Sequence, residues 1–101
     1  MDKINRQLKI PESFRPFFWN VDFDNLDPEK NNLFVINRLF NMYNTEAFIW
    51  VEENYTKEEI IEAIKTLRDW HAVAINFLKD RYDVPENEIN FYKMGCKKWK
   101  R

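Results

Sequence analysis

The chain has 101 residues, of which 45% are hydrophobic and 17% aromatic, so it is long enough for one domain with a single core and too apolar for a disordered segment. With one glycine and four prolines, it is poorly suited to a β-sandwich, which needs many tight turns. The formal net charge of −1 indicates no particular class of partner.

The charge is distributed unevenly along the chain. Residues 93–101 contain five basic residues and no acidic one, whereas residues 1–92 contain 11 basic and 17 acidic ones, which predicts an acidic body with a short basic tail. No apolar run approaches the roughly 20 residues that span a bilayer, and the N-terminus lacks the apolar stretch of a secretory signal. A single cysteine, Cys96, excludes an intramolecular disulfide. We therefore expect a cytoplasmic protein without membrane association.

Residues 10–27 are rich in aromatic side chains and contain two prolines and no glycine. The prolines exclude a continuous helix, and the aromatic content excludes a solvated loop. We therefore expect a strap, residues 10–27, that lies across a helical core, preceded by a polar N-terminal segment, residues 1–9. The expected anchors of the strap are Phe14, Phe17, Phe18, Trp19 and Phe23.

A first helix is predicted to begin at Asp27 and Pro28, which are typical of an N-cap and a first helical position. Apolar side chains follow at helical spacing, and Asn44 tolerates the left-handed conformation that ends many helices. We expect this helix to end near Tyr43. Its apolar face consists of Leu33, Ile36, Leu39, Phe40 and Tyr43.

Two further helices follow closely. Asn44 or Thr45 is placed to cap a second helix that runs to about Asn54. Thr56 and Glu59 match the capping box of a third helix. The expected inward residues are Ala47, Phe48, Trp50 and Val51 on the second helix and Ile60, Ile61, Ile64 and Leu67 on the third.

The remainder of the chain predicts a fourth helix and a short fifth one. Asp69 is placed to cap the fourth helix, and Val84–Pro85 interrupts the helical pattern. The final helix is expected from Glu86 to about Met94, with Gly95 as its stop. The expected inward residues of the fourth helix are Val73, Ala74, Phe77, Leu78 and Tyr82.

The predicted fold class is all-α: a compact bundle of four to five short helices with an aromatic, proline-containing N-terminal strap. We expect a single helical domain over residues 10–94 and a basic C-terminal tail over residues 95–101. The short connections between the helices favour antiparallel neighbours.

The residues give little support for catalysis or for a metal site. A calcium loop that started at Asp22 would need glycine at its sixth position and glutamate at its twelfth, but the chain has Asp27 and Leu33 there. His71 has no base or nucleophile at a helical spacing that faces it, and pairing with Cys96 would require the tail to fold back. We therefore expect a protein that is not an enzyme and holds no cofactor.

Three segments are candidates for binding a partner. In the strap, Arg15, Phe18 and Trp19 are of the residue types that supply binding energy at interfaces, as is Trp50 on the second helix, although such aromatic residues are more often core. A cluster of carboxylates around Glu52 and Glu58 is either a solvated face or a surface that steers a basic partner. The tail mixes cations with an aromatic ring, as single-stranded nucleic-acid contacts do, but also resembles a solvated end or a contact for an acidic protein. The tail residues are Lys97, Lys98, Trp99, Lys100 and Arg101.

Residues 11–19, Pro-Glu-Ser-Phe-Arg-Pro-Phe-Phe-Trp, resemble the motif Pro-x-x-Phe-x-Pro-Leu-Phe-Trp of a small uncharacterised prokaryotic domain family. The likeness continues through Leu26–Asp27 and the first helix to Trp50 and Tyr55, and weakens after Leu67. Where relatives tend to have glycine after the first helix, this chain has Asn44. Some relatives are encoded beside nucleotidyltransferase-type toxins of abortive-infection systems, so the resemblance implies an antitoxin or accessory role without assigning any functional residue.

The leading functional hypothesis is a non-enzymatic protein-binding module, antitoxin-like or accessory, that binds and restrains a toxin or defence enzyme. The expected contacts are Arg15, Phe18, Trp19, Trp50, Glu52 and Glu58. The alternative is a nucleic-acid-binding accessory or autoregulatory protein that uses the basic tail, whose binding would weaken steeply with salt.

Overall fold

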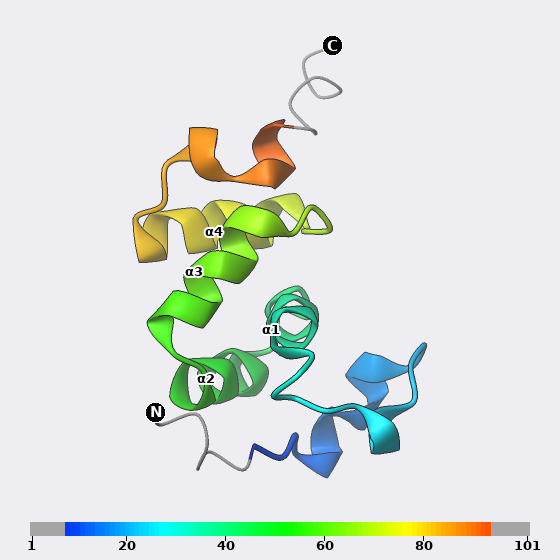
Figure 1. Ribbon diagram of the computed structural model, residues 1–101. Helices are drawn as coiled ribbons and strands as arrows, with labels where there is room; N and C mark the ends of the chain where they lie inside the picture. The colour runs from blue at the N-terminus through cyan, green and yellow to red at the C-terminus, as the bar shows by residue number, and fades with distance from the viewer. Residues whose placement is uncertain (1–7, 94–101) are drawn as a thin grey trace.

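The computed structural model describes residues 8–93, and within this range it contains helices and turns but no strand (Figure 1). The all-α prediction is confirmed. Helical residues 90–93 follow η4, and the predicted stop at Gly95 lies outside the described residues. The elements in chain order are η2 (Glu12–Phe18), η3 (Phe23–Asn25), α1 (Asn32–Phe40), α2 (Thr45–Asn54), α3 (Lys57–Thr66), α4 (Ala72–Tyr82) and η4 (Glu86–Glu88).

The helices that begin with side-chain caps were located correctly. The side-chain oxygen of Asn44 accepts a hydrogen bond from the backbone N–H of Ala47 at 2.9 Å. Thr56 and Glu59 form the predicted capping box, because each side chain accepts a hydrogen bond from the backbone N–H of the other residue. These bonds satisfy donors that the first turn of a helix otherwise leaves unpaired.

Both ends of α1 differ from the prediction. The carboxylate of Asp27 accepts the N–H of Glu29 at 2.9 Å within a turn, and the helix begins only at Asn32. At the other end, Tyr43 adopts the left-handed conformation, with φ of 55°. Asn44, the predicted left-handed residue, is instead extended, with φ of −115°, because it caps the next helix.

The predicted cap of α4 was also wrong. His71, not Asp69, is the N-cap residue. The backbone carbonyl of Asp69 accepts hydrogen bonds from the side-chain amides of Asn37 at 2.8 Å and Asn41 at 3.1 Å. The N–H of His71 in turn donates to the side-chain oxygen of Asn41 at 3.0 Å. Two buried asparagines, one in α1 and one at its C-cap, therefore hold the connection between α3 and α4.

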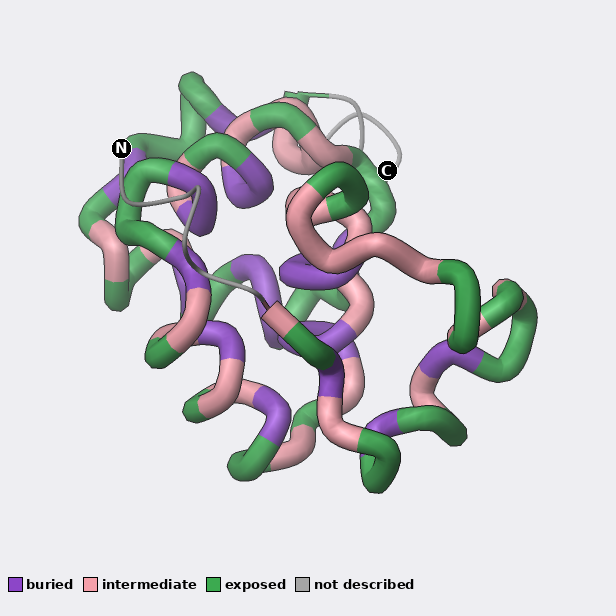
Figure 2. Tube along the Cα trace, turned by 60° about the horizontal axis from the view of Figure 1, so that its bottom comes forward, coloured by how far each residue is buried: buried purple, intermediate pink, exposed green. Residues whose placement is uncertain are grey.

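The inward face of α4 is rotated from the expected one. Val73 and Phe77, predicted to lie inward, are 70% and 53% exposed, whereas Ile75 is fully buried with Ala74 and Leu78. Tertiary contacts decide this face, because α4 packs on α3 and is approached near Asn76 by Tyr92. The stripe with Val73 and Phe77 is left on the outside. Figure 2 shows how buried and exposed residues alternate along the turns of the helices.

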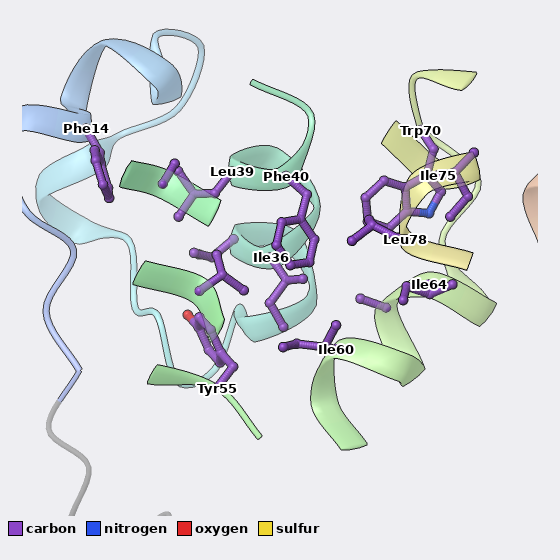
Figure 3. Packing of buried hydrophobic residues seen from close by; sticks show 14 of the residues in the cluster. Phe14, Ile36, Leu39, Phe40, Tyr55, Ile60, Ile64, Trp70, Ile75 and Leu78 are labelled. Carbon is purple, nitrogen blue, oxygen red and sulfur yellow. The ribbon is translucent and has the colours of Figure 1, made fainter. Parts of the chain in front are cut away.

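The core forms where α1 packs against both α2 and α3, and α3 packs against α4. Side chains from all four helices belong to this cluster. Figure 3 shows labelled side chains of α1, α3 and α4 gathered together, with Tyr55, the residue after α2, beside them. The large side chains that are almost fully buried are Phe18, Ile36, Leu39, Ile60, Ile64, Ile75, Leu78 and Ile89.

The strap lies against α1 and α2, at the end of the molecule opposite to residues 86–93 (Figure 1). Phe14 and Phe18 are buried, and Arg38 of α1 donates to the carbonyl of Phe17 at 2.9 Å. Trp19, which was expected among the anchors, is 78% exposed. The short 3₁₀ helix η2 ends at Phe18, so the next side chain in the turn points away from the core.

Candidate functional site

An open apolar groove lies where the first turns of α2 and α4 approach the end of α1. Its volume is about 390 Å³, within the range of roughly 300–1,000 Å³ that is typical of ligand pockets. Most of its lining is aromatic or aliphatic. The lining residues are Phe40, Tyr43, Asn44, Thr45, Phe48, Val73, Ala74, Phe77 and Leu78.

Two pairs of side chains, one helical turn apart, hold α2 beside α4. The ring centres of Phe48 and Phe77 lie 5.8 Å apart. One turn further along both helices, Arg81 donates from Nε and Nη2 to the two carboxylate oxygens of Glu52, at 2.6 and 2.9 Å. The two helices therefore run in the same direction along the groove, and this ion pair lies just beyond the groove's lining residues.

The surroundings of this ion pair shift the pKa values of Glu52 and of the neighbouring Tyr82. Hydrogen bonds from Arg81 lower the pKa of Glu52, with a further contribution from the hydroxyl of Tyr82, against the opposing effect of burial. Burial, followed by its bond to Glu52, raises the pKa of Tyr82 to about 12. Glu52 is therefore ionised and Tyr82 protonated at neutral pH. The guanidinium of Arg81 also lies 5.2 Å from the centre of the Phe48 ring, a favourable distance for a cation–π contact.

Tyr43 stands at the opposite end of the groove. Its positive φ is uncommon for a bulky residue and costs roughly 1–2 kcal/mol. Its ring is 61% exposed and lies 5.6 Å from the ring of His71, the residue that precedes α4. The tight link between α1 and α2 therefore holds an aromatic side chain in solvent at the edge of an apolar surface.

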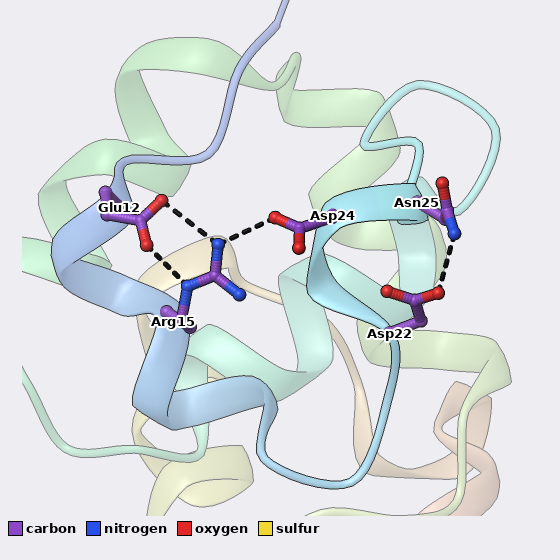
Figure 4. A network of polar contacts seen from close by, with 5 residues as sticks. All are labelled: Glu12, Arg15, Asp22, Asp24 and Asn25. Carbon is purple, nitrogen blue, oxygen red and sulfur yellow. Dashed lines mark hydrogen bonds and ion pairs between the residues drawn. The ribbon is translucent and has the colours of Figure 1, made fainter.

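The structure places Arg15 in a network within the strap (Figure 4). Its guanidinium bonds to the carboxylate of Glu12 and, at 2.7 Å, to that of Asp24. It also lies 4.7 Å from the centre of the Phe23 ring. These bonds lower the pKa values of both carboxyl groups. Arg15 thus connects η2 to η3 and already has acidic partners on the strap.

The three aromatic residues predicted to contact a partner have different surroundings. Phe18 is 1% exposed and packs against Phe23 and Phe34, which removes it from the candidate contact surface. Trp50 is half-buried and makes edge contacts with Phe14 and Tyr55. Of the three, Trp19 has its side chain in solvent.

The two predicted acidic contacts are not equivalent either. Glu52 is engaged by Arg81 and Tyr82 of α4, whereas Glu58 is exposed in the first turn of α3. The structure therefore does not gather the predicted contact residues on one surface. Arg15 is tied to the strap and Glu52 to α4.

The remaining predicted sites lie partly beyond the described residues. The basic tail, residues 95–101, and Cys96 lie outside them. Residues 8–93 contain no group of three or more histidine, cysteine, aspartate or glutamate side chains placed to hold a metal ion. No helix in the same range is long and apolar enough to cross a bilayer.

Sequence reasoning missed the groove because it assigned Val73 and Phe77 to the core. One signal was present: apolar residues occupy positions 73, 74, 75, 77 and 78 of α4. This stripe is wider than the roughly 100° that a helix needs for packing on a core. The excess width indicated a second apolar contact, although the pattern alone does not show which edge remains exposed.

Fold and groove define the chain as a small all-helical domain with an exposed apolar surface between two helices. Residues 13–64 match the model of a family of unknown function, DUF6922, and the chain belongs to this family. The expected membership of an uncharacterised family is thereby confirmed. The match runs from η2 to α3, so one wall of the groove, α4, lies outside it. No curated protein and no solved structure matches the chain.

Proposed function

We propose that this protein is a non-enzymatic protein-binding module of an antitoxin-like or accessory kind, which binds and restrains a toxin or another defence enzyme. The observation that carries the proposal is the apolar groove with three large, strongly exposed side chains, Tyr43, Val73 and Phe77. Exposed apolar surface of this kind, bordered by polar residues, is typical of protein-binding sites.

The chemistry of the groove favours recognition of apolar side chains. Asn44 and Thr45 are its polar lining residues, and the side-chain oxygen of Asn44 is already bonded to the N–H of Ala47. Sites for small polar ligands instead need several polar groups that converge on the ligand. The aromatic rings of Phe48 and Phe77 offer a large contact area at little conformational cost.

The class of the partner rests on a different argument. The resemblance of the strap motif to proteins encoded beside nucleotidyltransferase-type toxins implies a partner of this class, and a small accessory protein would bind the product of the neighbouring gene. The partner in this proposal is accordingly the enzyme encoded next to this chain.

Co-expression of the full chain with that neighbouring enzyme tests the proposal. We expect the tagged chain to retain the untagged enzyme through affinity and size-exclusion chromatography, and to reduce its toxicity or activity. A chain that elutes alone in both steps, with the enzyme expressed and folded, would overturn the proposal.

The same preparation tests the nucleic-acid alternative. Electrophoretic mobility shifts with single- and double-stranded DNA are measured for the full chain and for a variant in which Lys97, Lys98, Lys100 and Arg101 are glutamine. Binding that weakens steeply with salt and is lost in the variant would favour the alternative. Equal, weak shifts for both proteins would leave the protein-binding function as the better account.

A further inference from the structure

We infer that the groove receives an amphipathic helix of the partner protein, with two bulky apolar side chains one turn apart in the groove and lysine or arginine residues flanking them. This inference rests on the proposed protein-binding function and specifies the element that is bound. Helix-in-groove binding is a common mode of recognition, in which apolar residues spaced by three or four positions serve as anchors.

The dimensions of the groove fit a short helical segment. Its lining on α4 runs from Val73 to Leu78, and on α2 from Thr45 to Phe48, so each wall is between one and one and a half turns, or roughly 5–8 Å, long. The ion pair between Glu52 and Arg81 follows at one end. Two side chains at positions i and i+4 of a bound helix span such a length.

The walls present apolar surface that the monomer leaves in water. Val73 is 70% exposed, Tyr43 61% and Phe77 53%. Beneath them, Phe40, Ala74 and Leu78 are buried and form the floor. A bound side chain would therefore contact aromatic rings on both sides and a packed apolar base, which is the setting in which interface residues contribute most.

The charge around the groove favours a cationic partner. Residues 8–93 carry ten basic and sixteen acidic side chains. Glu46, which follows the lining residue Thr45 in the chain, is acidic and exposed. Arg81, whose guanidinium lies 5.2 Å from the centre of the Phe48 ring, is neutralised by Glu52. Lysine or arginine residues on the partner helix would thus approach a domain with an excess of carboxylates, which increases the association rate and the specificity.

The same charge distribution disfavours a second copy of this domain as the occupant. Two such bodies, each with an excess of six carboxylates, would repel each other across a shared groove. The basic tail of the same chain carries the right charge and an aromatic residue, Trp99, so occupation by the tail is a distinct outcome of the experiment below.

The test uses the full chain and three fluorescent peptides of about 15 residues, a length at which isolated helices begin to be stable. The first peptide has two leucines four positions apart among alanines and lysines. In the second, glutamate replaces every lysine; in the third, alanine replaces both leucines. Fluorescence anisotropy measures their affinities. We expect the first peptide to bind at least tenfold more tightly than either of the others.

Variants locate the binding site. Phe77→Gln and Val73→Gln are each expected to weaken binding of the first peptide about tenfold, with unchanged circular dichroism. Trp19→Gln, which alters a still more exposed aromatic residue on the strap, is the control and is expected to bind like the wild type. Val73→Gln keeps the test valid if Phe77→Gln loses its fold, because Val73 is the more exposed of the two.

Several results with the peptides and variants would overturn the inference: equal binding of all three peptides, loss of binding in Trp19→Gln alone, tighter peptide binding after Trp99→Ala, and a dimer in sedimentation that Val73→Gln dissociates. The third would assign the groove to the chain's own tail, and the fourth to a second copy. If no peptide binds but the chain still co-purifies with the neighbouring enzyme, the inference about the groove is overturned and the proposed function is not. If the peptides bind as expected but the neighbouring enzyme does not co-purify with the chain, only the choice of partner is overturned.

Discussion

Tyr43 combines an unfavourable backbone conformation with an exposed aromatic side chain. An asparagine in the same position would adopt the left-handed conformation at lower cost, because its short polar side chain can hydrogen-bond locally. Tyrosine at this position is less favourable for stability than asparagine would be, but it places an aromatic ring beside the groove. A strained backbone together with an exposed ring is expected of a residue that contributes to binding a partner more than to the stability of the fold.

We therefore expect Tyr43→Asn to stabilise the protein by about 0.5 kcal/mol, the relief of backbone strain less the loss of the contact with His71. Urea denaturation of the two proteins measures the difference. Glu46→Asn, at an exposed position with ordinary helical geometry, is the control and should lower the stability slightly, because asparagine is a poorer helix former. A loss of more than 1 kcal/mol in Tyr43→Asn would show that its ring contributes mainly to the fold.

Glu52 is a second residue whose role has a measurable signature. Its folded-state pKa is lowered, chiefly by Arg81, so the folded state binds this proton less tightly than the unfolded chain does. The stabilisation is complete above the ordinary glutamate pKa of 4.5 and is lost as the pH falls through the lower folded-state pKa. Because Arg81 is almost half exposed, solvent screening limits the effect to about 0.5–1 kcal/mol.

Comparison of the wild type with Glu52→Gln from pH 3 to pH 7 tests this interpretation. The wild type should be the more stable protein at neutral pH, and its advantage should shrink below about pH 4. Glu53→Gln removes the same charge from the exposed side of α2 and should change the stability by less than about 0.5 kcal/mol. A constant difference between wild type and Glu52→Gln at all pH values would contradict the role of the ion pair.

The strap is held on the domain by its buried aromatic rings. Two consecutive aromatic residues of the strap differ in this respect, because one is buried and the other is exposed. Phe18 is buried against Phe23 and Phe34, with Arg38 lying 5.8 Å from the centre of its ring. Trp19 is the next residue and lies in solvent. The two positions therefore form a natural pair for mutation.

Phe18→Ala should cost about 3–5 kcal/mol, because it removes a large side chain from the core and leaves a cavity. Trp19→Ala should change the stability by no more than about 0.5 kcal/mol. Chemical denaturation of the two variants gives both values. Similar losses in the two variants would show that Trp19 packs on the domain in solution, and the strap would then need a different arrangement.

The elements also show which parts of the fold are readable from sequence. Asn44 and the pair Thr56 and Glu59 located the starts of α2 and α3 correctly, since a cap bonds to backbone only two or three residues away. Asp27 satisfied the same local rule but capped a turn. Local signals place a turn at such a residue without showing how far the helical conformation continues.

At the scale of the whole molecule, the sequence predicted the fold class but not the candidate site. Which side of α4 is exposed depends on contacts with other segments of the chain, such as the hydrogen bond between Tyr92 and Asn76. The hydrophobic periodicity of the helix carries no information about these contacts. Asp69 likewise engages α1 through its backbone carbonyl, a contact that its residue type does not indicate. Val73 and Phe77 were thus assigned to the core, and the groove was found only in three dimensions.

The family match ends in α3, yet the core continues into the last third of the chain. Trp70, Ile75, Leu78, Val84 and Ile89 are buried members of the same cluster as the residues of α1 and α3. The buried amides of Asn37 and Asn41 also depend on the carbonyl of Asp69. The matched segment is therefore part of a domain whose core needs α4.

A fragment of residues 8–66 should accordingly fail to fold cooperatively. It would expose to water the apolar faces of α1 and α3 that pack on the last third of the chain, and it would remove the bonds by which Asn37 and Asn41 hold the carbonyl of Asp69. Thermal unfolding by circular dichroism, with NMR dispersion, measures the outcome. A fragment of residues 8–93 keeps every described contact and should unfold cooperatively like the full chain. A sharp transition in the shorter fragment would show that α4 is an addition to an independent domain, and the groove would then lie between two separable parts.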